Sequence, residues 1–191
     1  YAERFQLEAS QLWVDLRLGF DTPTGPIEPD PFLLGAQGLP HQHIFFGSGT
    51  YDPMIAMGVG YTSNGYVVAL SLGGTTGLYE NRFGYRKGIS GQAQLSAGYR
   101  LDPTWQFLGT SEFSHEEPSA WSGRAARNSG STSVSIGGQV SYRVAQDSSF
   151  SVALERPFIL AVENGSFEMP FVARIGFVQQ WPGEVKAPQK Q

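Results

Sequence analysis

One sequence pattern constrains this chain more than any other, and it occurs three times. An alternating apolar segment ends on an aromatic residue, a tight turn follows, and an aromatic residue opens the next alternating segment. The turns lie at residues 62–65, 101–104 and 145–148. Each aromatic residue has the parity of the apolar residues around it, so both point to the same face of a strand. The aromatic residues placed in this way, one of them near the C-terminus, are Tyr61, Tyr66, Tyr99, Trp105, Tyr142, Phe150 and Phe177.

A ring of amphipathic aromatics at one end of an apolar outward face is what a membrane–water interface selects. The pattern therefore predicts an all-β fold, an antiparallel up-and-down transmembrane β-barrel. Period-2 alternation predicts about eight strands in this chain, which is either a whole barrel or part of a larger one. The expected strands cover residues 4–20, 51–61, 66–74, 89–101, 105–114, 131–144, 149–156 and 168–179.

The connections between these strands alternate between the short turns and long segments at 21–50, 75–88, 115–130 and 157–167. Short periplasmic turns opposite long extracellular loops are typical of bacterial outer-membrane barrels, so we expect that localisation. The barrel is expected to occupy residues 1–181, and the Pro/Lys/Gln-rich residues 182–191 to form a flexible tail.

Composition excludes several other classes of protein. The net charge of −4 over 191 residues offers no basic surface for nucleic acid. No apolar run approaches the roughly 20 residues that a membrane-spanning helix needs. The absence of cysteine excludes a disulfide framework and thiolate metal sites. The chain opens at Tyr1 without a basic-then-apolar leader, so we expect either a removed signal peptide or further chain upstream.

Strand residues of the opposite parity are polar and are expected to line the lumen. The lining residues are Asp15, Arg17, Gln92, Gln94, Arg100, Glu112, Gln139, Arg143, Glu155 and Arg174. Opposite charges inside a barrel must pair or stay hydrated, because a lone buried charge is costly. Two interpretations remain open: a salt-bridged plug that fills a narrow interior, or a hydrated conduit whose charges tune selectivity.

The sequence contains few candidates for other chemistry. In an extended segment, His41 and His43 would lie on one side and could share a Cu²⁺ or Zn²⁺ ion, although two histidines without a third fixed ligand more often mark a solvated loop. Ser114 and His115 are adjacent on a strand and point to opposite faces, so they cannot act as nucleophile and base. We therefore expect no enzymatic activity and no cofactor. Two long connections carry basic residues that suit either lipopolysaccharide phosphates or a solvated surface, namely Arg82, Arg86, Lys87, Arg124 and Arg127.

Three segments carry a resemblance to a known family. Residues 16–25 read LRLGFDTPTG, residues 46–53 read FGSGTYDP, and residues 94–101 read QLSAGYRL. They resemble segments of the outer-membrane transporter family of the meta-pathway of phenol degradation. The resemblance implies an outer-membrane β-barrel that passes small, hydrophobic molecules, and it implies no catalytic residues.

Three functional hypotheses follow. The first is a passive, porin-like channel or transporter for small molecules, surrounded by outer-membrane lipid and lipopolysaccharide. The second is a non-conducting structural subunit that binds a protein partner in a larger envelope assembly. The third is a soluble lipocalin-like barrel, which predicts that Tyr61, Tyr66, Tyr99 and Trp105 are buried inside.

Overall fold

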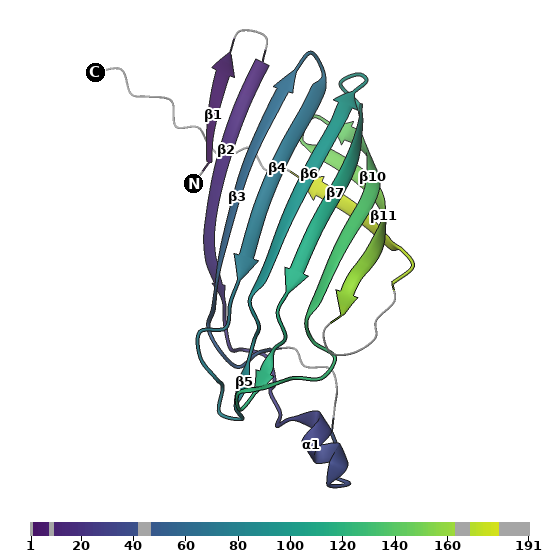
Figure 1. The fold of residues 1–191 in the computed structure, drawn as a ribbon. Coiled ribbons are helices and arrows are strands. Elements are labelled where there is room, and N and C mark those ends of the chain that lie inside the picture. Colours follow the sequence, from purple (N-terminus) through teal and green to yellow (C-terminus); the bar gives the residue numbers. More distant parts are fainter. Residues whose placement is uncertain (1, 8–9, 42–46, 163–168, 180–191) are drawn as a thin grey trace, which may run out of the picture.

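The computed structural model describes residues 2–7, 10–41, 47–162 and 169–179. Nine strands form one antiparallel sheet in the order β1-β2-β3-β4-β6-β7-β10-β11-β12. The sheet is strongly curled, with the shape of half a barrel (Figure 1). This architecture confirms the predicted all-β, antiparallel, barrel-like fold.

The main sheet contains all the long strands of the chain. Their bounds are β1 (Ala2–Leu7), β2 (Ser10–Asp21), β3 (Asp52–Ser63), β4 (Tyr66–Thr75), β6 (Ser90–Arg100), β7 (Trp105–Glu116), β10 (Ser131–Ala145), β11 (Ser148–Val162) and β12 (Val172–Gln179). The long connections carry helix α1 (Pro31–Ala36) and a three-stranded sheet of β5 (Tyr85–Arg86), β8 (Ala120–Trp121) and β9 (Arg124–Ala125). Both α1 and β5 lie at the lower end of the sheet in Figure 1.

The prediction of a single strand over residues 4–20 is wrong. That segment contains two antiparallel strands, β1 and β2, paired from Ala2↔Asp15 to Leu7↔Ser10. The sequence between them, Glu8-Ala9, contains none of the Gly, Pro or Asn residues that mark a tight turn. Those two residues lie outside the described part of the chain. The main sheet consequently has nine strands and not eight.

The long connections also hold more regular structure than their Gly- and Pro-rich composition predicts. Besides α1 and the small sheet, β11 continues to Val162, although a connection was expected from residue 157. Pro157 lies beyond Glu155↔Val172, the last described pair between β11 and β12. In that part β11 has a described neighbour only on the β10 side, and proline is tolerated in such edge strands.

The tight turns are built as their residue types require. Asn64 and Gly65 both have positive φ, 48° and 84°, as a type I′ turn between β3 and β4 demands. At the next turn, Asp102 Oδ1 accepts hydrogen bonds from the backbone N–H of Thr104 at 2.6 Å and of Trp105 at 2.8 Å. These turns lie at one end of the sheet and the long connections at the other (Figure 1).

Strand register sorts the side chains onto two different faces. One row across the sheet pairs Asp15 with Gly58, Gly58 with Ser71, Ser71 with Gln94, and Gln94 with Glu112. This polar face is concave, since a hollow of about 500 Å³ on it runs from β2 to the start of β10. The opposite, convex face is apolar.

The apolar convex face is not covered by other parts of the described chain. Among the described residues, Ala126 alone is a buried hydrophobic residue. The four aromatics that a lipocalin-like barrel would bury are 45%, 64%, 40% and 39% exposed, in the order Tyr61, Tyr66, Tyr99 and Trp105. These exposures contradict the lipocalin-like alternative. In the part of the chain that the structure describes, no helix has the length and apolar character to cross a membrane.

Candidate functional site

All ten residues predicted to line the lumen lie on the concave face, because they share strand parity or register. One row joins Arg17, Ala56, Gly73, Gln92 and Ser114, and the adjacent row contains Asp15, Gln94 and Glu112. Nearer the short turns, register places Gln139 with Leu108, Arg174 with Ala153, Arg100 with Gln106, and Arg143 with Ser149.

A carboxylate–arginine pair lies on β2. Arg17 Nε is 2.9 Å from Asp15 Oδ1, and the two side chains are 77% and 14% exposed. Asp15 lies opposite Gly58, where a Cβ atom would collide with the Asp15 carboxylate. The glycine at position 58 therefore leaves room for the Asp15 carboxylate to lie against strand β3. Trp13 covers Gly60 in the same manner, since a Cβ there would collide with its indole ring.

A second pair repeats this arrangement between β11 and β12. Arg174 Nη1 donates a hydrogen bond to Glu155 Oε1, and the side chains are 57% and 9% exposed. Glu155 lies opposite Gly137, where a Cβ would collide with the aliphatic part of the glutamate side chain. In both pairs the carboxylate is thus much less exposed than the guanidinium, which faces solvent on the concave face.

The ion pairs of the described strands do not cross the interior. Asp15 and Arg17 belong to one strand, and Glu155 and Arg174 belong to neighbouring strands. A salt-bridged plug requires pairs that join opposite walls. The described strands form half a barrel, so the choice between a plug and a hydrated conduit stays a prediction.

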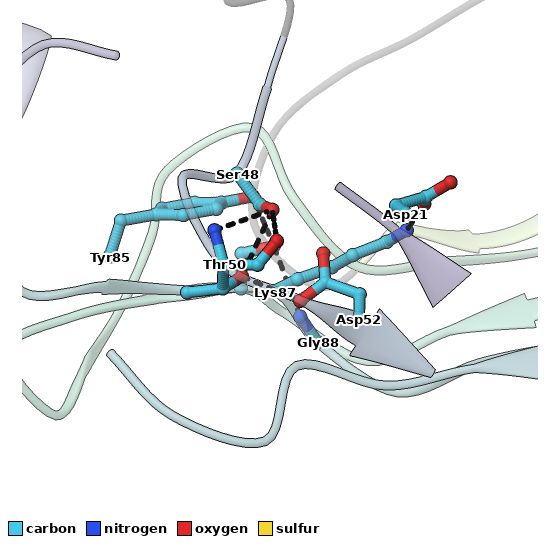
Figure 2. Close-up of polar contacts among 8 residues, drawn as sticks. Asp21, Ser48, Thr50, Asp52, Tyr85, Lys87 and Gly88 are labelled. Atoms are coloured by element: carbon cyan, nitrogen blue, oxygen red, sulfur yellow. Dashed lines mark hydrogen bonds and ion pairs between the residues drawn. The ribbon is translucent and has the colours of Figure 1, made fainter. Parts of the chain in front are cut away.

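The long connections fold into a cap, which we define as residues 22–51, 76–89 and 117–130 within the described chain. At its centre, Thr50 is fully buried and its Oγ1 donates to Asp52 Oδ1 at 2.5 Å. The Thr50 N–H donates to Ser48 Oγ at 3.3 Å, as Figure 2 shows. This short polar segment joins the cap to the first residue of β3.

Asn81 and Ser119 tie the other two connections to this segment. Asn81 Nδ2 donates to the Ser48 carbonyl oxygen at 2.7 Å, and Asn81 Oδ1 accepts from the N–H groups of Phe83 and Tyr85. The Tyr85 hydroxyl donates to Ser119 Oγ at 3.1 Å, and the Gly88 N–H donates to the same oxygen at 3.3 Å. Three long connections are thus held together by hydrogen bonds.

The phenol of Tyr85 is half-buried within the cap. Burial raises the pKa of Tyr85, and the negative charges of Glu116 and Asp52 raise it further, whereas the hydrogen bond to Ser119 acts in the opposite direction. Tyr85 therefore stays protonated and keeps its hydrogen bond to Ser119 well above neutral pH.

A cavity of about 1000 Å³ lies between the cap and the strand ends. Its polar lining includes Asp21 and Asp52, which are direct register partners on β2 and β3. Like charges opposite each other are destabilising. Lys87 offsets this repulsion because its Nζ is 3.5 Å from Asp21 Oδ2, and Figure 2 shows its side chain extending to Asp21.

The remaining candidate residues are distributed over the cap and β7. His41 is exposed, with Nδ1 3.0 Å from the Leu39 carbonyl oxygen, and His43 lies outside the described residues. No group of three or more His, Cys, Asp or Glu residues suited to a metal occurs in the described chain. A site at His41 and His43 remains a prediction. Ser114 Oγ is 2.7 Å from Ser133 Oγ, whereas His115 Nδ1 is 2.8 Å from Thr132 Oγ1, so this pair has separate partners.

The basic residues of the long connections have local partners in several cases. The Arg82 guanidinium lies over the Phe83 ring, with 4.8 Å between its Cζ atom and the ring centroid. The Arg127 guanidinium lies over the Phe32 ring, with a corresponding distance of 5.4 Å. A role of these cations toward lipopolysaccharide remains a prediction.

The aromatic residues of the repeated pattern form a girdle on the convex face near the short turns. Tyr66 and Tyr99 have ring centroids 4.9 Å apart, and those of Trp105 and Tyr142 are 4.7 Å apart. Register continues the row from Tyr142 to Phe150 and from Phe150 to Phe177. Rings that were distant in the sequence thus become neighbours around the outside of the sheet.

Two features of the site were not predicted from the sequence. Gly58 and Gly137 make room for the two carboxylates, and their inward parity was visible, but their partners depend on register. The hydrogen-bonded cap was also missed, although the FGSGTYDP segment contains its central residues Ser48, Thr50 and Asp52.

Comparison with known proteins supplies a family. The family model described as "Putative MetA-pathway of phenol degradation" matches residues 40–175, well over half of the chain. The match begins in the connection before β3 and ends within β12. No curated protein matches this chain.

Proposed function

The chain belongs to the MetA-pathway of phenol degradation family, and from that membership we propose that it forms the wall of a bacterial outer-membrane β-barrel that passes small molecules. The observation that carries the proposal is the contrast between the two faces of one curled sheet. The convex face is apolar and exposed, with an aromatic girdle, whereas the concave face is lined with polar and charged groups.

The dimensions of the strands support a membrane location. The seven strands from β2 to β11 in the main sheet are 10 to 15 residues long. A tilted transmembrane strand needs about 9–11 residues. On β7, the apolar positions from Trp105 to Phe113 span roughly 26 Å along the strand at about 3.3 Å per residue. At a tilt of about 45° this covers about 19 Å of the roughly 25 Å apolar band of such barrels.

Free sheet edges place a further requirement on this proposal. Among the described residues, β1 and β12 do not pair with each other. Lipid supplies no partners for backbone N–H and C=O groups, so both edges must pair with further strands in the membrane. The aromatic girdle and short turns then lie on the periplasmic side, and the cap lies on the outer side.

A route for solute is supported by the two hollows. The cavity between the cap and the strand ends and the hollow on the concave face share Glu116 and Ser131 in their linings. The polar lining suits a hydrated path from the outer side along the wall. We propose no catalytic step along it, and none of the described residue groups requires one.

Planar-bilayer conductance of the protein, purified from the envelope in its assembled form, tests this function. We expect discrete channels from the wild type. Ser71→Trp adds a bulky ring to the concave face and should reduce conductance, whereas Leu70→Trp, its neighbour on the convex face, should not. Extraction of the wild type from the envelope without detergent would contradict the membrane location. Stable insertion without conductance would favour a structural subunit.

A further inference from the structure

The exposed charges of the concave face are mostly of one sign. The arginines on it that the structure describes, Arg17, Arg100, Arg143 and Arg174, are all exposed. The carboxylates among the strands behave differently: Asp15 and Glu112 are half-buried, and Glu155 is buried. The exposed exceptions lie at the cap end, namely Glu116 on β7 and Asp21, the last residue of β2, which pairs with Lys87.

This asymmetry has a structural cause that occurs twice. Asp15 and Glu155 each lie opposite a glycine, and each is bonded by an arginine whose remaining donors face the interior. A guanidinium has five N–H donors, so a single carboxylate does not exhaust it. One pair lies within a strand and the other joins two strands, yet both present the cation to solvent.

Two further arginines add positive charge near the short turns, where they line one hollow together with Asp102 and Asp147. No ion pair among the described residues involves Arg100 or Arg143, and both are exposed toward the short-turn end. Between the cap and the short turns, the exposed charges on the concave face are therefore guanidinium groups, whereas the cavity at the cap end is lined by Asp21, Asp52 and Glu116. Charges that line a pore in this way select solutes of the opposite sign.

The surroundings of Arg17 also indicate what else the solute contains. The hollow of about 500 Å³ beside Arg17 is lined on one side by Met54, Ala56, Gly73 and Gly74, and its polar lining includes Gln92, Ser114 and Glu116. A planar carboxylate suits the fork of a guanidinium, and a small apolar body suits the surface of Met54, Ala56 and the two glycines.

We propose that the concave face selects small organic anions, specifically monocarboxylates with a compact apolar body, through Arg17 and Arg174. The proposal rests on the proposed channel function and names the solute class of that same site. The two arginines act as specificity-determining residues, and Asp15 and Glu155 position them. No covalent step is involved.

The reversal potential in a KCl gradient tests the sign of the selectivity. We expect the wild type to favour chloride over potassium. Arg17→Gln with Arg174→Gln should lower the chloride-to-potassium permeability ratio by about two- to fivefold, the range that exposed, screened charges contribute. Arg156→Gln is the matched control, because Arg156 has the opposite parity and lies over the Phe158 ring on the convex face.

Replacing an arginine alone leaves its carboxylate partner unpaired, and this can disturb folding. A second pair of variants controls for that effect. Asp15→Asn with Arg17→Gln neutralises the first pair completely and should still lower anion preference. Asp15→Asn alone frees Arg17 and should raise anion preference. Opposite effects of these two variants are not expected from a merely structural ion pair.

Benzoate and benzamide, which have similar shapes but differ in charge, test the solute class. We expect benzoate to compete with the chloride current in the wild type and to lose this effect in the neutralised variants. Benzamide should not compete. A conducting channel that prefers potassium, or that keeps its selectivity in the neutralised variants, overturns the inference. A channel that does not conduct overturns the proposed function as well.

Discussion

The curled main sheet, which we call the wall, and the cap stabilise carboxylates in different ways. In the wall, Glu155 is bonded by Arg174, whose guanidinium stays exposed on the concave face. Where the cap meets the sheet, Asp52 of β3 is only 1% exposed and accepts a hydrogen bond from the Thr50 hydroxyl, while Lys87 of the cap pairs with Asp21 of β2. The wall therefore keeps charge available to a solute, whereas the cap uses its polar groups to hold loops together.

The largest effect is expected from breaking the cap at Asn81. Asn81→Ala removes hydrogen bonds to Ser48, Phe83 and Tyr85, and this should cost about 2–4 kcal/mol of cap stability. Amide hydrogen exchange should rise in residues 76–89 and 117–130, while exchange in β3 and β4 stays slow. Gln146→Ala, at an exposed amide in a short turn, is the control. Equal loss of protection in the wall would show that the cap and wall do not unfold separately.

A smaller effect is expected from adding one methyl group to the wall. Gly137→Ala places a Cβ against the Glu155 side chain and the Leu154 carbonyl oxygen and should destabilise the sheet by about 1–3 kcal/mol. Gly138→Ala is the matched control in the same strand, because a Cβ there is 3.6 Å from the Leu108 carbonyl oxygen, an ordinary contact. The temperature of unfolding in detergent measures both variants. If the two alanines had equal effects, the packing of Glu155 against Gly137 would be irrelevant to stability.

The wall was more predictable from sequence than the cap because its information is local. Alternation assigns each residue to a face, and Asn64-Gly65 marks the turn between β3 and β4 without knowledge of distant residues. The β1–β2 turn was missed because its two residues carry no turn signal. Cap contacts join residues far apart, 33 positions from Ser48 to Asn81 and 34 from Tyr85 to Ser119, and no periodicity relates them.

A pH effect is expected to be confined to the cap. Because burial raises the pKa of Tyr85, the unfolded cap loses this proton first as pH rises above the ordinary tyrosine value of about 10. The stabilisation is therefore complete below that pH and decreases above it. Tyrosinate absorbance should show a late-titrating phenol that Tyr85→Phe removes. If Tyr85→Phe removed only an early-titrating phenol, the burial of this hydroxyl would be disproved.

The smallest effect distinguishes the ion pairs of the two regions. Where the cap meets β2, Lys87 and Asp21 are 26% and 54% exposed, so Lys87→Gln should change cap stability by less than about 1 kcal/mol. In the wall, Arg174→Gln leaves the carboxylate of Glu155 buried without its cation and should cost more, because an unpaired buried charge is expensive. Glu155→Gln with Arg174→Gln should recover much of that loss, since no charge then remains buried. Unfolding in detergent for the wall and hydrogen exchange for the cap measure the difference. Equal costs for the two single variants would mean that burial of the carboxylate does not separate wall from cap.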